Sequence, residues 1–217
     1  AFEDIKKLFD PAGLLNPGKI VRPSKMDDRE LFRYAPGYAV QPLKTALDWS
    51  AWDVHNDPAT EELTAPGSGG DPAHGLGKAV EMCNNNGHCR KFDAGTMCPS
   101  FRVTRDEAHL TRGRANTLRL ALSGQLGTEA LASDTVKDAL DLCVSCKGCK
   151  RECPTGVDMA RMKIEVQHHY KASHGHTLRD KLIAHLPRYA GMASRFAGLV
   201  NLRNRLPWLA RMGEALT

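Results

Sequence analysis

Apolar residues recur every three or four positions along much of this 217-residue chain, and this spacing predicts amphipathic helices. The first predicted helix covers residues 2–9, and Asp10-Pro11 ends it because proline restricts the residue before it. A capping box formed by Thr104 and Glu107 predicts the start of a second helix, which Gly127 would end. Further helices are predicted over residues 133–143, 155–170, 177–186 and 195–216, the last with a break at Pro207.

Two segments lack this period. Residues 23–56 carry scattered polar and aromatic residues, and residues 57–77 contain three prolines and five glycines, which is typical of a linker or a mobile loop. We therefore expect a mainly α fold preceded by an irregular segment. The composition agrees, since 41% hydrophobic but only 6% aromatic residues suit a helical domain better than a β-sandwich.

No stretch approaches the roughly eighteen apolar residues that a membrane helix needs. The start, AFEDIKKLFDPAG, lacks an initiator Met and does not have the form of a signal peptide, so we expect a piece of a longer polypeptide or a processed chain. Residues 150–217 hold twelve Lys/Arg against five Asp/Glu, within a net charge of +5. These cations are spread at helical intervals without interleaved aromatic residues, which favours a solvated helix face over a nucleic-acid partner.

The seven cysteines are an odd number, so they cannot all pair with one another. All of them lie between residues 83 and 153, and the flanking segments have none. This distribution indicates a local site in a reducing compartment rather than a disulfide framework.

The densest run is CVSCKGCKRECP, residues 143–154, which reads C-x2-C-x2-C-x3-C-P. Its first three thiols can each hold a different iron of one cubane, and the cysteine before proline ligates the other cluster in the bacterial two-cluster pattern. The fourth ligand of this cluster must then come from elsewhere in the chain. The other Cys-Pro pair, Cys98-Pro99, supplies it. A zinc site is the alternative, although structural zinc usually takes two separate pairs of thiols. We therefore predict a [4Fe–4S] cluster on Cys98, Cys143, Cys146 and Cys149.

The first run, C-x5-C-x8-C-P, is degenerate. Laid over the intact run, Cys83 and Cys89 take the first and third places, and Asn86 stands where the second cysteine should be. The crossing rule adds Cys153, which gives this second site three thiolates. Three options stay open: a [3Fe–4S] cluster, a [4Fe–4S] cluster with a non-cysteine ligand such as His88 or Asn86, or no cluster.

Other side chains near the runs have less specific interpretations. Arg112 and Arg114 could hydrogen-bond a cluster or an acidic partner surface, or they could form the solvated face of a helix. Three methionines, Met97, Met159 and Met162, are predicted to pack in the core next to the clusters.

The stretches CNNNGHCRKFDAGTMCPSFRVTRDEAHLTRGRAN and LDLCVSCKGCKRECPTGVDMARMK resemble the iron–sulfur region of large bacterial FAD-linked oxidoreductases, among them D-lactate, glycolate and D-2-hydroxyglutarate dehydrogenases. The resemblance covers about residues 79–172. It implies an α-helical ferredoxin domain with irregular cluster-binding loops over residues 78–172, and a basic helical tail over residues 173–217 that leads to a further domain.

The segment FDPAGLLNPGKIV resembles the end of the FAD-linked oxidase fold, which implies that residues 1–22 close a flavin domain lying upstream in the same polypeptide. The same resemblance implies that Asn16 lies near the FAD. Residues 23–77 then form the irregular segment and linker.

The function implied is electron transfer from the reduced flavin of a D-2-hydroxyacid dehydrogenase to a quinone, a cytochrome or a soluble carrier. This places the protein in the cytoplasm or at the inner face of the membrane, where peripheral association is an option. This chain alone is not expected to turn over substrate. The competing hypothesis is a zinc-stabilised module that binds protein or nucleic acid.

Overall fold

The computed structural model describes residues 1–26, 28–31, 38–53 and 73–216, and over these residues it is mainly helical and contains no β-strand. The mainly α fold class is thereby confirmed. Most of the predicted linker, residues 54–72, lies outside the described residues.

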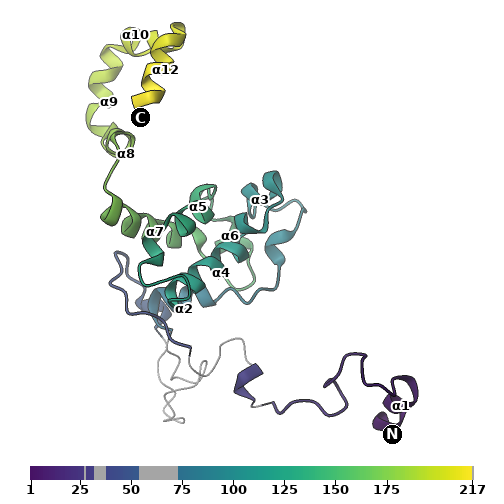
Figure 1. The fold of residues 1–217 in the computed structure, drawn as a ribbon. Coiled ribbons are helices and arrows are strands. Elements are labelled where there is room, and N and C mark those ends of the chain that lie inside the picture. Colours follow the sequence, from purple (N-terminus) through teal and green to yellow (C-terminus); the bar gives the residue numbers. More distant parts are fainter. Residues whose placement is uncertain (27, 32–37, 54–72, 217) are drawn as a thin grey trace.

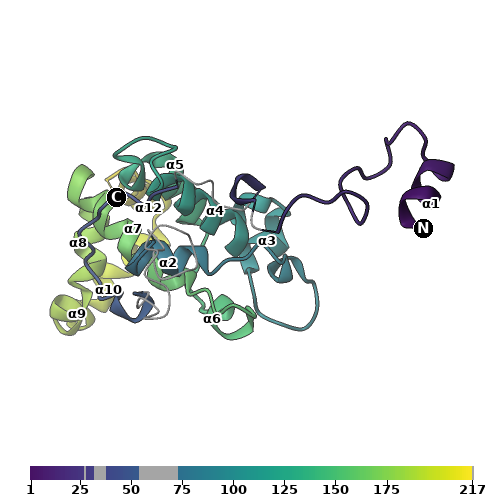
Figure 2. The same cartoon turned by 90° about the horizontal axis from the view of Figure 1, so that it is seen from below.

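The body of the molecule is a group of helices, α2–α7, that pack around one apolar core (Figure 1). Helix α1 lies away from this body at the end of an extended segment, as both Figure 1 and Figure 2 show. These helices are α1 (Phe2–Phe9), α2 (Gly75–Glu81), α3 (Pro99–Thr104), α4 (Thr111–Leu122), α5 (Asp134–Asp141), α6 (Gly148–Glu152) and α7 (Met159–His174).

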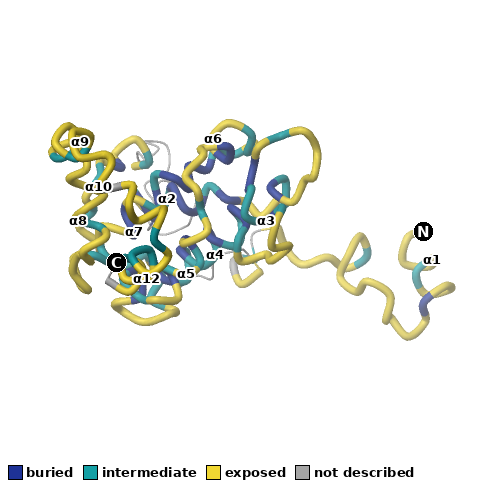
Figure 3. The backbone as a smooth tube through the Cα atoms, turned by 90° about the horizontal axis from the view of Figure 1, so that it is seen from above, coloured by how far each residue is buried: buried dark blue, intermediate teal, exposed yellow. Residues whose placement is uncertain are grey.

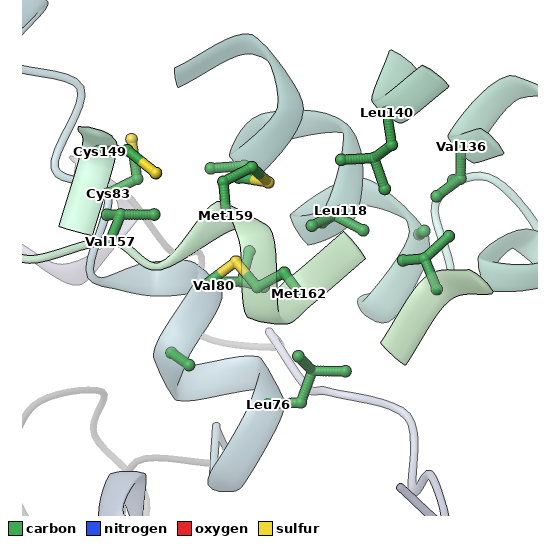
Figure 4. Close-up of a cluster of buried hydrophobic side chains, with 14 of the residues drawn as sticks. Leu76, Val80, Cys83, Leu118, Val136, Leu140, Cys149, Val157, Met159 and Met162 are labelled. Atoms are coloured by element: carbon green, nitrogen blue, oxygen red, sulfur yellow. The ribbon is translucent and has the colours of Figure 1, made fainter. Parts of the chain in front are cut away.

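The core lies where α2, α4, α5 and α7 meet, and Figure 4 shows their apolar side chains directed toward one another. Leu118 of α4, Val136 of α5 and Met162 of α7 are each at most 1% exposed. Full burial of such a side chain stabilises the fold by about 1.5–3 kcal/mol. The three methionines predicted to pack here are buried as expected, including Met97 and Met159.

Side-chain caps fix where two core helices begin. The Ser133 side chain accepts a hydrogen bond from the N–H of Val136 and starts α5, as predicted. The Asp158 carboxylate accepts one from the N–H of Arg161 at 3.1 Å and starts α7. The predicted start of α7 behind Thr155 is therefore three residues too early.

The predicted helix start at Thr104 is wrong. Thr104 ends the short helix α3, and its hydroxyl donates back to the carbonyl of Ser100. Arg105 then takes a positive φ of 59°, which a helix cannot continue. A 3₁₀ turn over Glu107–His109 follows, capped by Asp106, and α4 begins only at Thr111.

Among the groups of α7 that hold the segment before the linker is the buried carboxylate of Glu165, which is 0% exposed. It accepts hydrogen bonds from the backbone N–H groups of Ala46 and Leu47 at 2.6 and 3.0 Å, and from Nε1 of Trp49 at 2.9 Å. Nε2 of His169 lies 3.2 Å away on the next turn. A buried charge with this many donors is satisfied, and it orders an otherwise irregular segment.

The chain ends in a series of short helices, α8–α12, that extend from the end of α7. Their side chains are mostly exposed, as the yellow trace in Figure 3 shows, and include Leu186, Phe196 and Trp208. The predicted break at Pro207 is confirmed, and Pro187 also starts a helix. The bounds are α8 (Leu178–Ala184), α9 (Leu186–Arg195), α10 (Ala197–Val200), α11 (Leu202–Arg205) and α12 (Pro207–Leu216).

Candidate metal centre

The intact cysteine run forms a tight loop between α5 and α7. Ser145 and Lys147 both have positive φ angles, 54° and 58°, and these turns wrap the backbone around the thiols. Cys149 is buried in α6, whereas Cys146 is exposed at the turn of the loop.

The Cys-Pro of the first run reaches this loop from α3. A small cavity is lined by Cys98, Cys143 and Cys146, and by Thr111 and Arg114 of α4. The fourth predicted thiol, Cys149, interacts electrostatically with two of them, Cys98 and Cys143. The structure therefore brings together thiols from loops more than forty residues apart in sequence, and all seven cysteines are free thiols.

The start of α4 donates hydrogen bonds to thiols of both predicted sites. The N–H of Thr111 lies 3.1 Å from Sγ of Cys98, and the Thr111 hydroxyl lies 3.0 Å from the same sulfur. The next backbone N–H, that of Arg112, donates to Cys89 of the first run. Unsatisfied N–H groups at a helix start carry a positive partial charge, so they stabilise thiolates.

The start of α7 repeats this arrangement. The backbone N–H of Met159 donates to Cys149, and that of Val157, just before the helix, donates to Cys153. Each of the two longest core helices thus begins beside one cysteine of each predicted site. Hydrogen bonds to the sulfurs are one of the means by which proteins set cluster potentials.

The three remaining cysteines belong to the predicted second site. Cys83 and Cys89 are buried, and negative charge on Cys98 or on Cys83 would raise the pKa of Cys89, so Cys89 lies near a thiol of each predicted site. Cys83 and Cys149 belong to the same cluster of buried side chains, and both are labelled in Figure 4. Cys153 is half-buried, and the residues before Cys153 and Cys89 line one open hollow.

The thiol pKa values follow burial and hydrogen bonding. Burial raises the pKa of Cys89 to about 11, against the opposing hydrogen bond from Arg112. Burial likewise raises the pKa of Cys149. At Cys153 burial is outweighed by hydrogen bonds from the Thr155 hydroxyl and nearby N–H groups, which lower its pKa. Metal binding would displace the protons of the buried thiols, because metals bind the thiolate form.

A single carboxylate ties the two Cys-Pro segments together. Glu152, directly before Cys153, accepts hydrogen bonds from the N–H and hydroxyl of Thr96 at 2.8 and 2.6 Å. It also accepts one from the N–H of Met97, directly before Cys98, at 3.0 Å. These bonds lower the pKa of Glu152 and hold the ends of the two runs in fixed register.

The two arginines of α4 differ. Arg114 is 2% exposed and donates from Nε to the carbonyl of Ala139 and from a terminal nitrogen to the Ser100 hydroxyl, both at 2.8 Å. It lines the cavity with the thiols, so the interpretation as a solvated face is wrong for this residue. Arg112 instead pairs with Glu107 at 2.5 Å nearer the surface.

The donor set fits iron–sulfur ligation, since it consists of free thiols that receive N–H donors. Among residues 1–26, 28–31, 38–53 and 73–216, no three His, Cys, Asp or Glu side chains converge as ligands of one metal ion.

Asn16 is exposed, with a positive φ of 47°, in the extended segment outside the helical body. The sequence did not predict that Thr111 donates to Cys98 or that Glu152 binds the segment before Cys98. No sequence motif indicates either contact.

Comparison with known proteins supplies the context for these cysteines. Residues 79–157 match the 4Fe–4S dicluster domain family. The chain is 27% identical over 97% of its length to a D-2-hydroxyglutarate dehydrogenase of Escherichia coli (strain K12), and 27% identical over 94% to that of Pantoea ananatis (strain AJ13355). The Pseudomonas putida (strain KT2440) enzyme of the same name is 26% identical over 98% of the chain.

The chain spans only about a fifth of the length of these relatives, 22%, 21% and 22% in turn. No solved structure matches the chain. No described helix has the length and apolar character to cross a membrane. The resemblance to the iron–sulfur region of these oxidoreductases is thus confirmed: residues 79–157 match the 4Fe–4S dicluster domain family, and the chain is similar to a segment of the D-2-hydroxyglutarate dehydrogenases.

Proposed function

We propose that this chain is the electron-transfer module of a FAD-dependent D-2-hydroxyacid dehydrogenase, and that D-2-hydroxyglutarate is the substrate to test first. Its role is to carry electrons from the reduced flavin to a quinone, a cytochrome or a soluble acceptor. An iron–sulfur cluster bound here would supply one-electron redox chemistry, and it would accept single electrons from the reduced flavin.

The residues of the chain would bind and tune two clusters. One [4Fe–4S] cluster is assigned to Cys98, Cys143, Cys146 and Cys149, and a second site to Cys83, Cys89 and Cys153. The starts of α4 and α7 stabilise the negative charge of the thiolates, and buried Arg114 adds a full positive charge beside the first site. These groups would raise the potentials, because the reduced state carries the larger negative charge.

The flavin belongs to another part of the same polypeptide in this proposal. Residues 1–22 would end that domain, with Asn16 near the FAD, and residues 23–77 would connect it to the iron–sulfur domain over 78–172. Residues 173–217 would lead onward. The Glu165 contacts with Ala46 and Leu47 support this role of the connection, since they fix the incoming segment on α7. The same proposal includes the location of the protein. It lies in the cytoplasm, either free or peripherally associated with the inner face of the membrane.

One observation carries the proposal: the start of α4 donates to two thiols of the first run, Cys98 and Cys89, and the start of α7 donates to two thiols of the intact run, Cys149 and Cys153. A zinc site that braces a binding module needs one set of four ligands. It gives no reason for a second set of buried thiols with N–H donors of its own.

The test uses the full-length protein purified without oxygen. Iron, zinc and acid-labile sulfide are measured, and EPR spectra are recorded after reduction by dithionite and after D-2-hydroxyglutarate. We expect iron and sulfide in equal amounts, little zinc, and reduction of the clusters by the hydroxy acid. A colourless protein that contains zinc contradicts the proposal and supports the binding module.

Paired variants test the assignment of ligands. Cys98→Ala and Cys149→Ala should diminish the same EPR signal although they lie in different runs, and Cys89→Ala should diminish the other. If Cys98→Ala and Cys89→Ala instead affect one signal together, each run holds its own cluster and the crossing assignment is wrong.

A further inference from the structure

The two cysteine loops follow the same local backbone path. In the intact loop, positive φ angles fall two and four residues after Cys143, at Ser145 (54°) and Lys147 (58°). In the first loop they fall two and four residues after Cys83, at Asn85 (63°) and Gly87 (75°). A short helical segment follows in both loops, starting at Gly148 and at His88. Positive φ is rare outside glycine, so this agreement identifies equivalent positions.

By this alignment Asn86 occupies the place of Cys146. Both side chains are exposed at the turn of their loops, and both accept a hydrogen bond from the N–H two residues later. In the intact loop Gly148 donates to Sγ of Cys146 at 3.5 Å, and in the first loop His88 donates to Oδ1 of Asn86 at 2.8 Å. The first loop therefore has the form of a cluster-binding loop, with a carboxamide where the exposed thiolate would be.

His88 is a poorer candidate for the fourth ligand. It aligns with Gly148, which lies two positions after Cys146 and is not a predicted ligand. His88 also lines the open hollow of about 660 Å³ that it shares with Lys91, Arg151 and Glu152.

We infer that the second site is built for three thiolates, and that its cluster has one solvent-facing corner, at Asn86, that no thiolate holds. This inference rests on the proposed function and goes further, because it distinguishes the two clusters chemically. A neutral carboxamide oxygen is a hard donor and binds iron more weakly than a thiolate does. The iron at this corner should therefore be the first to leave when the protein is oxidised.

The change balances with a one-electron oxidant such as ferricyanide. A [4Fe–4S]²⁺ cluster that gives up one electron and releases Fe²⁺ leaves a [3Fe–4S]⁺ cluster, which has its own EPR signal in the oxidised state. We expect the full-length protein, mildly oxidised with ferricyanide, to show this signal and to retain about seven irons per polypeptide.

Asn86→Cys should abolish the three-iron signal and raise the retained iron to about eight. Asn86→Ala removes the carboxamide without adding a thiol and should keep the signal. Lys91→Cys adds an exposed thiol outside the ligand positions and should also keep it. The reciprocal change, Cys146→Asn in the intact loop, should create a second three-iron signal, so the inference stays testable even if Asn86→Cys does not fold.

The inference is overturned if the oxidised wild-type protein keeps two four-iron clusters, or if only His88→Ala, and neither Asn86 variant, changes the signal. It is also overturned if the second site holds no iron while the first is fully loaded. If the proposed function itself were wrong, both clusters would be absent and the protein would contain no iron. Failure of this inference alone would leave the first cluster in place, so the iron content distinguishes the two failures.

Discussion

Thr111 directs both its backbone N–H and its hydroxyl at the sulfur of Cys98, at 3.1 and 3.0 Å. A thiolate can only accept hydrogen bonds, so both groups act as donors once a metal is bound. The residue therefore stabilises negative charge on one ligand of the first site from a fixed position at the start of α4.

Thr111→Val should lower the reduction potential of the first cluster. The change keeps the N–H and the shape of the side chain but removes the hydroxyl donor, and we expect the reduced state to lose about 1 kcal/mol more stabilisation than the oxidised state. This corresponds to about 40 mV for a one-electron couple, measured by EPR-monitored redox titration. Thr117→Val is the matched control, because its hydroxyl bonds to the Gly113 carbonyl on the same helix. If the reduction potential of Thr111→Val is unchanged, the backbone N–H of Thr111 alone, and not its hydroxyl, influences the potential of the first cluster.

Glu152→Gln should make the clusters easier to remove. The carboxylate holds the N–H groups of Thr96 and Met97, and a neutral amide would weaken these contacts because it lacks the negative charge. The measurement is the rate of iron loss to a chelator, and exposed Glu129→Gln provides the control. Equal rates in the two variants would show that the Cys-Pro segments do not depend on this tie.

Gly113→Ala should displace the start of α4 from the thiols. A Cβ at this position would lie 2.0 Å from the carbonyl oxygen of Glu107, a backbone atom that cannot rotate away. We expect a loss of about 1–3 kcal/mol in stability and reduced iron content, seen by thermal unfolding and metal analysis. Gly191→Ala in α9 meets no atom within 4 Å and should leave both unchanged or slightly improved. Full iron content in Gly113→Ala would contradict the role assigned to the helix start.

Glu165→Gln should release residues 46–49 from α7. Burial opposes ionisation of Glu165, but hydrogen bonds from Trp49, Ala46 and Leu47, together with His169, hold its pKa below the ordinary value of 4.5. Gln has one acceptor oxygen and leaves some buried donors unpaired, at a cost of about 1–3 kcal/mol. Hydrogen exchange should therefore become faster at the amides of residues 46–49, and exposed Glu214→Gln should have no such effect.

The same contact makes the segment sensitive to acid. Because the folded pKa of Glu165 is depressed, its stabilisation is present above pH 4.5 and is lost as the pH falls through the folded value. Wild-type protection at residues 46–49 should decline at acidic pH, whereas Glu165→Gln should show little dependence. Equal pH profiles would place the sensitivity in another group.

Much of the helical pattern could be predicted from the sequence, since apolar periodicity reflects one buried face. Ser133 and Pro207 were correct boundaries because a cap and a proline act locally. Thr104 failed for the same reason: its capping box is a local signal, and the positive φ at Arg105 ended the helix there. A local pattern cannot show whether the helix starts at the capping box of Thr104 or later, at Thr111, where the tertiary structure places it.

The candidate site shows a similar division. Spacing alone predicted that Cys98 would join the run from Cys143 to Cys149; Cys98, Cys143 and Cys146 line one cavity, and the assignment of the four thiols to one cluster stays a prediction. The donors at Thr111 and Arg112 could not be predicted, because they are backbone groups whose sequence carries no signature. Burial of Arg114 was equally hidden, since it depends on the carbonyl of Ala139 on another helix.

The first two amides of α4 serve cysteines of different sites, Cys98 and Cys89. A shift of this helix start would therefore alter the hydrogen bonds to one thiol of each proposed site at the same time. In the proposed electron-transfer module, this helix would not set the potential of one cluster independently of the other.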